Sequence, residues 1–125
     1  MNQRAQIGIT SERLDDDSGL VSVSGESDLY TAPQLKGELL RLIGAGAERV
    51  VVDLTNTSFV DSATLGVLLG GLKRLRPRGG EISLVIDDAN IRKIFEITLL
   101  DRVFPIVKTR SEALERVTTT ATTSS

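Results

Sequence analysis

Residues 50–75 read VVVDLTNTSFVDSATLGVLLGGLKRL, and this stretch decides the fold class. Its opening run, Val50 to Leu54, is rich in β-branched residues and is typical of a strand buried on both faces. A polar stretch from Thr55 to Ser58 follows. Beyond it, leucines recur at helical spacing, at Leu65, Leu68, Leu69, Leu72 and Leu75. The stretch therefore predicts a buried strand that leads into a helix, which Pro77 and Gly79 end.

The chain before this stretch predicts a β-hairpin. Ile7 and Ile9 alternate with polar residues, and a second apolar run from Leu20 to Val23 ends at Gly25. Between them, Asp15 to Gly19 has the composition of a turn, which favours antiparallel pairing. The three carboxylates of this turn could bind a cation, but a solvated turn is the favoured interpretation.

A helix is predicted next. Thr31 has the position of an N-cap, Gln34 has the spacing of a capping box, and Pro33 suits a first helical turn. Leu35, Leu39, Leu42 and Ile43 then form one apolar stripe. Gly44 and Gly46 end the helix, and they make no dinucleotide-binding motif because Arg49 stands where the third glycine is needed.

The strand and helix alternation continues to the C-terminus. Residues 82–86 predict a strand, Asp87 or Asp88 caps a short helix, and residues 104–107 predict an edge strand because Pro105 lacks a backbone donor. Thr109 and Glu112 form a second capping box before a last helix that ends its apolar stripe at Val117.

The predicted order is β-β-α-β-α-β-α-β-α, which indicates an α/β fold. We expect a mostly parallel sheet, an N-terminal antiparallel hairpin and about four helices. A chain of 125 residues fits one domain, which we place at residues 1–117. Seven of the eight residues 118–125 are Ser or Thr, so we expect this tail to be disordered.

Composition excludes several classes of function. The chain has no Cys and no His, so disulfides, thiolate or imidazole metal sites, cysteine nucleophiles and Ser-His-Asp triads are ruled out. A net charge of −2 and a pI near 5.2 argue against nucleic acid as a direct partner. No apolar run approaches a membrane span and the first residues lack a signal-peptide core. We therefore expect a cytoplasmic protein that binds no membrane, needs no cofactor or metal and is not an enzyme.

The junction between the central strand and its helix is the best candidate site, because function collects where parallel strands end and helices begin. Asp53 is predicted at the end of the strand, and Ser58, Asp61 and Ser62 follow just before or within the first helical turn. Either Asp61 or Ser62 would serve as an N-cap, so capping alone explains a polar residue there. From spacing alone, the structural role is favoured.

The run 51–68, VVDLTNTSFVDSATLGVL, resembles the signature of bacterial anti-sigma factor antagonists. These are single-domain members of the STAS (sulfate transporter and anti-sigma antagonist) family. Residues 25–32, GESDLYTA, and residues 97–104, ITLLDRVF, are also similar to segments of that family. The sequence departs from the pattern at Thr64 and Leu99, where glycine is common, and at Ser27, where an apolar residue is usual.

This resemblance implies a regulatory function. The unmodified protein would bind a cognate anti-sigma factor, usually a serine kinase, and so release a sigma factor. Phosphorylation at Ser62 would switch binding off, and a PP2C-type phosphatase would restore it. The resemblance implies a partner-binding surface that includes the following residues: Asp28, Asp53, Ser58, Asp61, Ser62 and Thr64.

Three of these residues also have a plain structural explanation. Asp53 would satisfy loop amides, Ser58 would be a turn residue and Asp28 would hold a loop. Thr64 would crowd the Ser62 hydroxyl, altering partner fit, and Thr64 or Ser58 would offer a second phosphate acceptor.

Two alternative functions stay open. In the first, the same domain would be a scaffold subunit of a transporter or stress-signalling assembly without a phosphorylation switch. The Asp61-Ser62 pair disfavours this alternative. A small enzyme or nucleotide-binding protein using Asp53 and Asp61 is less favoured, because the sequence holds no G-x-x-x-x-G-K loop.

Overall fold

The computed structural model describes residues 8–27 and 31–123. One mixed sheet has the order β1-β2-β3-β4-β5. The strands are β1 (Gly8–Arg13), β2 (Ser18–Ser27), β3 (Arg49–Val60), β4 (Glu81–Val85) and β5 (Ile106–Val107). The α-helices are α1 (Ala32–Gly44), α2 (Ser62–Leu75), α3 (Ala89–Ile97) and α4 (Arg110–Thr123), and the 3-10 helices are η2 (Arg76–Arg78) and η3 (Leu100–Arg102). The predicted element order and fold class are confirmed.

The predicted hairpin and the edge strand are both present. β1 pairs antiparallel with β2, and every other pair in the sheet is parallel, with β5 at the far edge. In the hairpin turn, the Oδ1 atom of Asp15 accepts hydrogen bonds from Asp17 N at 2.9 Å and Ser18 Oγ at 2.6 Å. This carboxylate shapes the turn, which agrees with the favoured interpretation. Ile7 lies outside the described residues.

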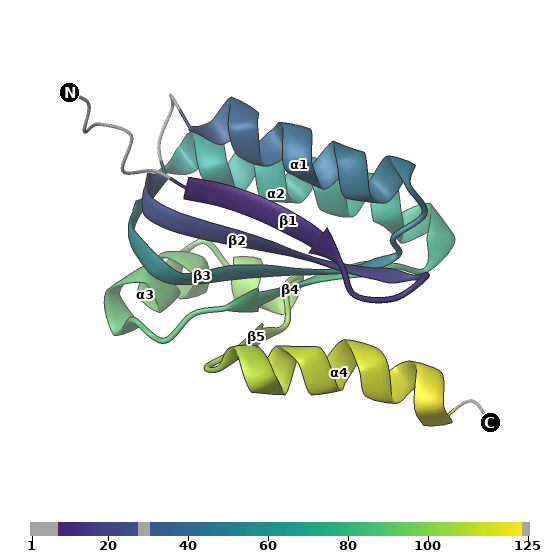
Figure 1. Ribbon diagram of the computed structural model, residues 1–125. Coiled ribbons are helices and arrows are strands. Elements are labelled where there is room, and N and C mark those ends of the chain that lie inside the picture. Colours follow the sequence, from purple (N-terminus) through teal and green to yellow (C-terminus); the bar gives the residue numbers. More distant parts are fainter. Residues whose placement is uncertain (1–7, 28–30, 124–125) are drawn as a thin grey trace.

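Helices cover both faces of the sheet. Figure 1 shows α1 and α2 side by side on one face and α4 on the other. Because side chains alternate along a strand, Val50 and Val52 of β3 pack in the larger core with α1 and α2, whereas Val51 packs with Ala113 and Val117 of α4. The central strand is therefore buried from both sides, as predicted.

Three of the four predicted caps form. Asp61 caps α2, Asp88 caps α3, and Thr109 exchanges hydrogen bonds with Glu112 at the start of α4. The capping box predicted at Thr31 is wrong: this residue occupies the N-cap of α1, but its side chain makes no capping hydrogen bond. Its backbone is already helical, with φ −97° and ψ −17°, whereas a capping side chain needs an extended backbone to reach the first-turn amides.

β3 is longer than predicted. We expected a loop at Thr55 to Ser58, but the strand continues to Val60 because β2 runs beside it as far as the pair Ser27 and Val60. Thr57 is buried there, and its Oγ1 donates to Val23 O at 3.2 Å. β4 pairs with β3 only as far as Asp53, so the end of β3 extends past β4. The polar segment Thr55 to Ser58 is thus part of the sheet because it pairs with β2.

The C-terminal helix is also longer than predicted. α4 continues to Thr123, so the expectation of a disordered segment directly after Val117 is wrong for the helix backbone. Once Ala113 and Val117 are docked, each further residue adds a hydrogen bond to an existing helix without a new nucleation step. Among residues 8–27 and 31–123, no helix has the length and apolarity to cross a bilayer.

Candidate functional site

The α2 N-terminus presents Ser62 to solvent. Asp61 has an extended backbone, with φ −113° and ψ −176°, and its carboxylate accepts a hydrogen bond from Thr64 N at 3.2 Å. Ser62 is the first helical residue, and its side chain is exposed. The first turn of a helix also offers backbone N–H groups that no intrahelical carbonyl can accept. An accessible hydroxyl therefore lies at a position that favours negative charge.

Thr64 is buried and contacts the Asp61 carboxylate. Its side chain has 0% exposed surface, and its Oγ1 lies 3.4 Å from the same Asp61 oxygen that accepts the Thr64 amide. This placement corrects two expectations, because a fully buried hydroxyl neither touches a partner nor receives a phosphate unless the helix opens. Thr64 instead holds the carboxylate of Asp61 in place.

The end of β3 carries two neighbouring exposed residues. In the pairing with β2, Gly25 faces Thr57 and Glu26 faces Phe59, so Ser58 is an extra residue on β3, a β-bulge. The bulge interrupts the alternation of inward and outward side chains, and both Ser58 and Phe59 are exposed. The Phe59 side chain is 47% exposed, three residues before Ser62. Sequence reasoning missed Phe59. In a strand without a bulge, side chains alternate, so burial of Thr57 would expose Ser58 and bury Phe59.

Asp53 lies apart from Ser62 in the fold. The prediction that Asp53 ends its strand is wrong. Asp53 lies inside β3, on the side that faces α4. Its Oδ2 accepts from Arg110 Nε at 2.8 Å, and its Oδ1 accepts from Thr55 N at 2.9 Å and Thr55 Oγ1 at 2.7 Å. Arg110 also donates to Ser22 Oγ at 2.8 Å. Asp53 thus joins the sheet to the first residue of α4.

Burial and hydrogen bonding act on Asp53 in opposite directions. The side chain is nearly enclosed, and burial alone would raise its pKa. The hydrogen bonds from Thr55 and Arg110 and the charge of Arg110 outweigh that effect, so the pKa of Asp53 lies below its ordinary value. The carboxylate is ionised at neutral pH and its acceptor atoms are already used within the chain.

The remaining predicted residue, Asp28, lies outside the described residues. Within residues 8–27 and 31–123, no group of three or more acidic side chains is placed to hold a metal ion. The structure thus places Asp61, Ser62 and the buried Thr64 at the start of α2, with Ser58 near the end of β3, and separates Asp53 from them.

The chain is similar to a known domain family, to named relatives and to solved structures. The family pattern described as STAS domain matches residues 9–113. The chain is 36% identical over 107 residues to a protein of Listeria monocytogenes named anti-sigma-B factor antagonist, which covers 85% of this chain and 93% of that relative. A solved anti-sigma factor antagonist from Mycobacterium paratuberculosis is 29% identical, with a TM-score of 0.81 over 94% of this chain and 98% of that one. The unphosphorylated anti-sigma factor antagonist SpoIIAA shares the fold, with a TM-score of 0.77 at 23% identity over 88% of this chain and 96% of that one.

Proposed function

Because the chain belongs to the STAS domain family, we propose that it is an anti-sigma factor antagonist, a protein that binds an anti-sigma factor and thereby frees a sigma factor. The relative from Listeria monocytogenes that bears this name matches most of both chains, which supports the same role here. The chain acts through binding rather than through catalysis. Its partner is an anti-sigma factor with serine kinase activity.

Phosphorylation of Ser62 is the proposed switch. The single observation that carries it is the exposed Ser62 hydroxyl in the first turn of α2, directly beside the Asp61 cap. The other residues considered as acceptors are less suitable: Thr64 is buried, and Ser58 lies within a strand rather than at a helix N-terminus. A PP2C-type phosphatase would remove the phosphate and restore binding.

The local charge explains how such a switch acts without refolding. A phosphate adds about −1.5 to −2 charge, and a helix N-terminus stabilises negative charge, so the domain keeps its structure. The phosphate also stands next to the Asp61 carboxylate, and both charges must be desolvated when a partner docks. A loss of about 3 kcal/mol in binding free energy lowers affinity more than a hundredfold.

The proposed docking surface is centred on Ser62 and Asp61, with Ser58 at its edge. Asp28 is included from its sequence motif alone, because it lies outside the described residues. Thr64 contributes by positioning Asp61, since it has no exposed surface of its own. We leave Asp53 out of this surface, because Arg110 and Thr55 already occupy its oxygens.

A phosphorylation assay tests the proposal. The protein is incubated with candidate anti-sigma factor kinases and ATP, and the modified residue is mapped by mass spectrometry. We expect one phosphate on Ser62, none on Ser62→Ala, and an undiminished amount on the control Ser111→Ala, which removes an exposed serine from the first turn of α4. Phosphate uptake by Ser62→Ala would show that the assignment is wrong. Anti-sigma factor binding with no phosphorylation by any kinase would contradict the Ser62 switch, and the absence of both binding and phosphorylation would favour the scaffold alternative.

A further inference from the structure

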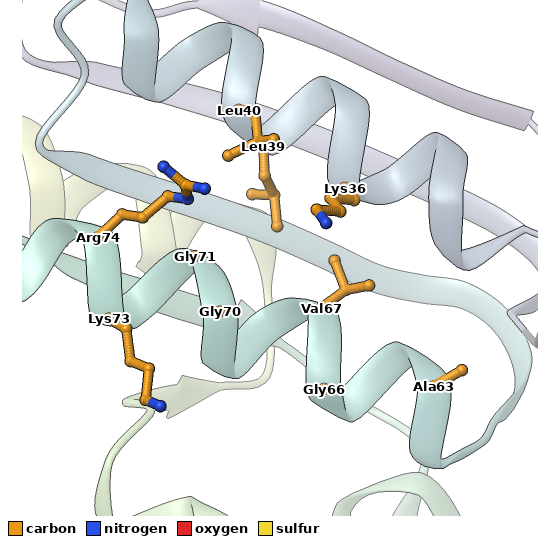
Figure 2. Close-up of a pocket in the computed structure, with 10 residues that line it drawn as sticks. All are labelled: Lys36, Leu39, Leu40, Ala63, Gly66, Val67, Gly70, Gly71, Lys73 and Arg74. Carbon is orange, nitrogen blue, oxygen red and sulfur yellow. The ribbon is translucent and has the colours of Figure 1, made fainter.

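A groove of about 540 Å³ runs between α1 and α2. Figure 2 shows Leu39 and Val67 pointing into it from opposite helices, with Gly70 and Gly71 along the α2 side. On α2 its lining extends from Ala63 to Arg74, about three helical turns or roughly 16 Å. The groove thus runs along most of α2, and it begins at the residue next to Ser62.

Positive charge borders this apolar floor. Lys36 of α1 and Arg74 of α2 both line the groove and point toward the space between the helices (Figure 2). Within the described part of the chain, neither side chain makes an ion pair or side-chain hydrogen bond. Lys73 also lines the groove, but its side chain points away from α1 (Figure 2). No acidic residue is among those that line the groove. A chain with a net charge of −2 therefore carries a locally positive groove.

We propose that this groove binds an acidic amphipathic α-helix of the anti-sigma factor, as a second docking site beside Ser62. The inference rests on the proposed function and extends it. Apolar side chains of the partner helix contact the partly exposed Leu40 and Val67, while its carboxylates pair with Lys36 and Arg74. Charge complementarity and the direct continuity with the Ser62 surface select this occupant.

The shape of the groove selects a helix over other forms of peptide. An extended strand binds by completing a sheet edge, and the two walls here are helices whose backbone groups are already paired. A polyproline segment needs aromatic residues, and none lines the groove. Gly66 and Gly70 leave α2 without side chains on two successive turns, so a partner helix can approach its backbone closely.

A second copy of this chain fits the groove less well. Packing two identical grooves against each other would bring Lys36 and Arg74 of each copy near the same residues of the other, and like charges repel. An acidic partner also explains the direction of the switch. A phosphate on Ser62 adds negative charge at the end of the groove that such a helix must pass, and repulsion weakens docking.

Groove variants test the inference. The affinity of the full chain for the anti-sigma factor that phosphorylates it is measured by calorimetry, at low and at physiological salt. A Cβ added at Gly70 meets nothing within 4 Å, so Gly70→Leu fills the groove without disturbing the core. We expect Gly70→Leu and the double variant Lys36→Glu/Arg74→Glu each to weaken binding at least tenfold, which is about 1.4 kcal/mol. Salt weakens binding of the unaltered protein and has less effect on the charge variant.

Matched controls separate the groove from general effects. Gly37→Leu places the same side chain at another open position, on α1 outside the groove lining, and Lys93→Glu/Lys108→Glu makes the same change in net charge elsewhere. Both controls should change affinity less than twofold, and circular dichroism should show all variants folded.

The outcomes distinguish this inference from the proposed function. If both groove variants bind like the unaltered protein while Ser62→Asp still weakens binding, the groove inference alone is wrong. If the unaltered protein binds no anti-sigma factor and Ser62 receives no phosphate, both fall. If sedimentation shows a dimer that Gly70→Leu abolishes, the occupant is a second copy and the inference is overturned.

Discussion

The two faces of the sheet use their charged residues differently. On the α4 face, Arg110 pairs with Asp53, and Arg116 pairs with Glu81 through contacts of 2.9 Å and 3.2 Å. In the groove between α1 and α2, Lys36 and Arg74 have no such partner within the described residues. Charges that are paired internally hold a helix to the sheet, whereas unpaired charges beside an open groove are available to another molecule. Substitutions on the first face should therefore change stability, and those on the second should change binding.

The largest effect is expected at the α2 N-terminus. The protein phosphorylated on Ser62 should bind the anti-sigma factor about a hundredfold more weakly than the unmodified protein. Ser62→Asp should lose less affinity, because an aspartate carries less charge than a phosphate. The melting temperature should stay within a few degrees, since a helix N-terminus accepts negative charge. Calorimetric titration and thermal melts on the same samples check this. Gross unfolding of Ser62→Asp would make the switch a folding effect and remove the contrast between the faces.

The opposite result is expected at Asp53. Asp53→Asn removes a nearly buried ionic partner of the half-exposed Arg110, so we expect a loss of about 2 kcal/mol in unfolding free energy. Anti-sigma factor affinity should be unchanged. Urea denaturation measures the first quantity and calorimetry the second. Asp87→Asn, at an exposed position, is the matched control and should alter stability by less than about 0.5 kcal/mol. Weakened partner binding by folded Asp53→Asn would return this residue to the docking surface.

The pH dependence of this difference follows from the lowered pKa of Asp53. A carboxyl whose pKa is lower in the folded state stabilises the fold fully above its unfolded pKa, about 3.9 for aspartate. That contribution is lost as the pH falls through the lower folded-state pKa. The gap in unfolding free energy between the unaltered protein and Asp53→Asn should therefore be constant from pH 7 to about pH 5 and shrink below about pH 4. A gap that widens in acid would contradict the assignment.

A substitution at Gly70, on the groove, should change stability and partner binding in opposite directions. Gly70→Ala adds a side chain where nothing lies within 4 Å, and alanine favours helix by about 1 kcal/mol over glycine. We expect a higher melting temperature together with weaker anti-sigma factor binding. Gly80→Ala is the counterpart, since its Cβ would lie 2.2 Å from Glu48 O and must destabilise the fold. A Gly70→Ala protein that gains stability and keeps full affinity would argue against docking in the groove.

The smallest effect is expected from the C-terminal end of α4. Truncation after Val117 removes the helical residues that follow Val117, the last core residue of α4 whose side chain the structure describes, so unfolding free energy should fall by less than about 1 kcal/mol. For a domain of this size that is a drop in melting temperature below about 5 °C. Anti-sigma factor affinity should not change. A larger drop, measured by circular dichroism, would show that the last turns of α4 pack on the sheet.

Local signals in the sequence predicted most elements of the fold. The apolar run Val50 to Leu54, the leucine spacing of α2 and the Thr109 capping box each depend on neighbouring residues, and all appear in the structure. The same reasoning missed the extension of β3 through Thr55 to Ser58, since that segment is strand only because β2 lies beside it. It also misplaced Thr64, whose burial depends on how α2 packs on the sheet.

The candidate site divides in the same way. The sequence by itself determined that a polar residue, Asp61 or Ser62, caps the helix after β3, because capping is set within four residues of chain. The structure assigns the cap to Asp61. Only the tertiary structure decided that Asp53 faces Arg110, 57 residues away, and that α1 and α2 leave a groove between Leu39 and Val67. The physical reason is that strand register turns each side chain toward one face or the other, and that register is set by distant strands.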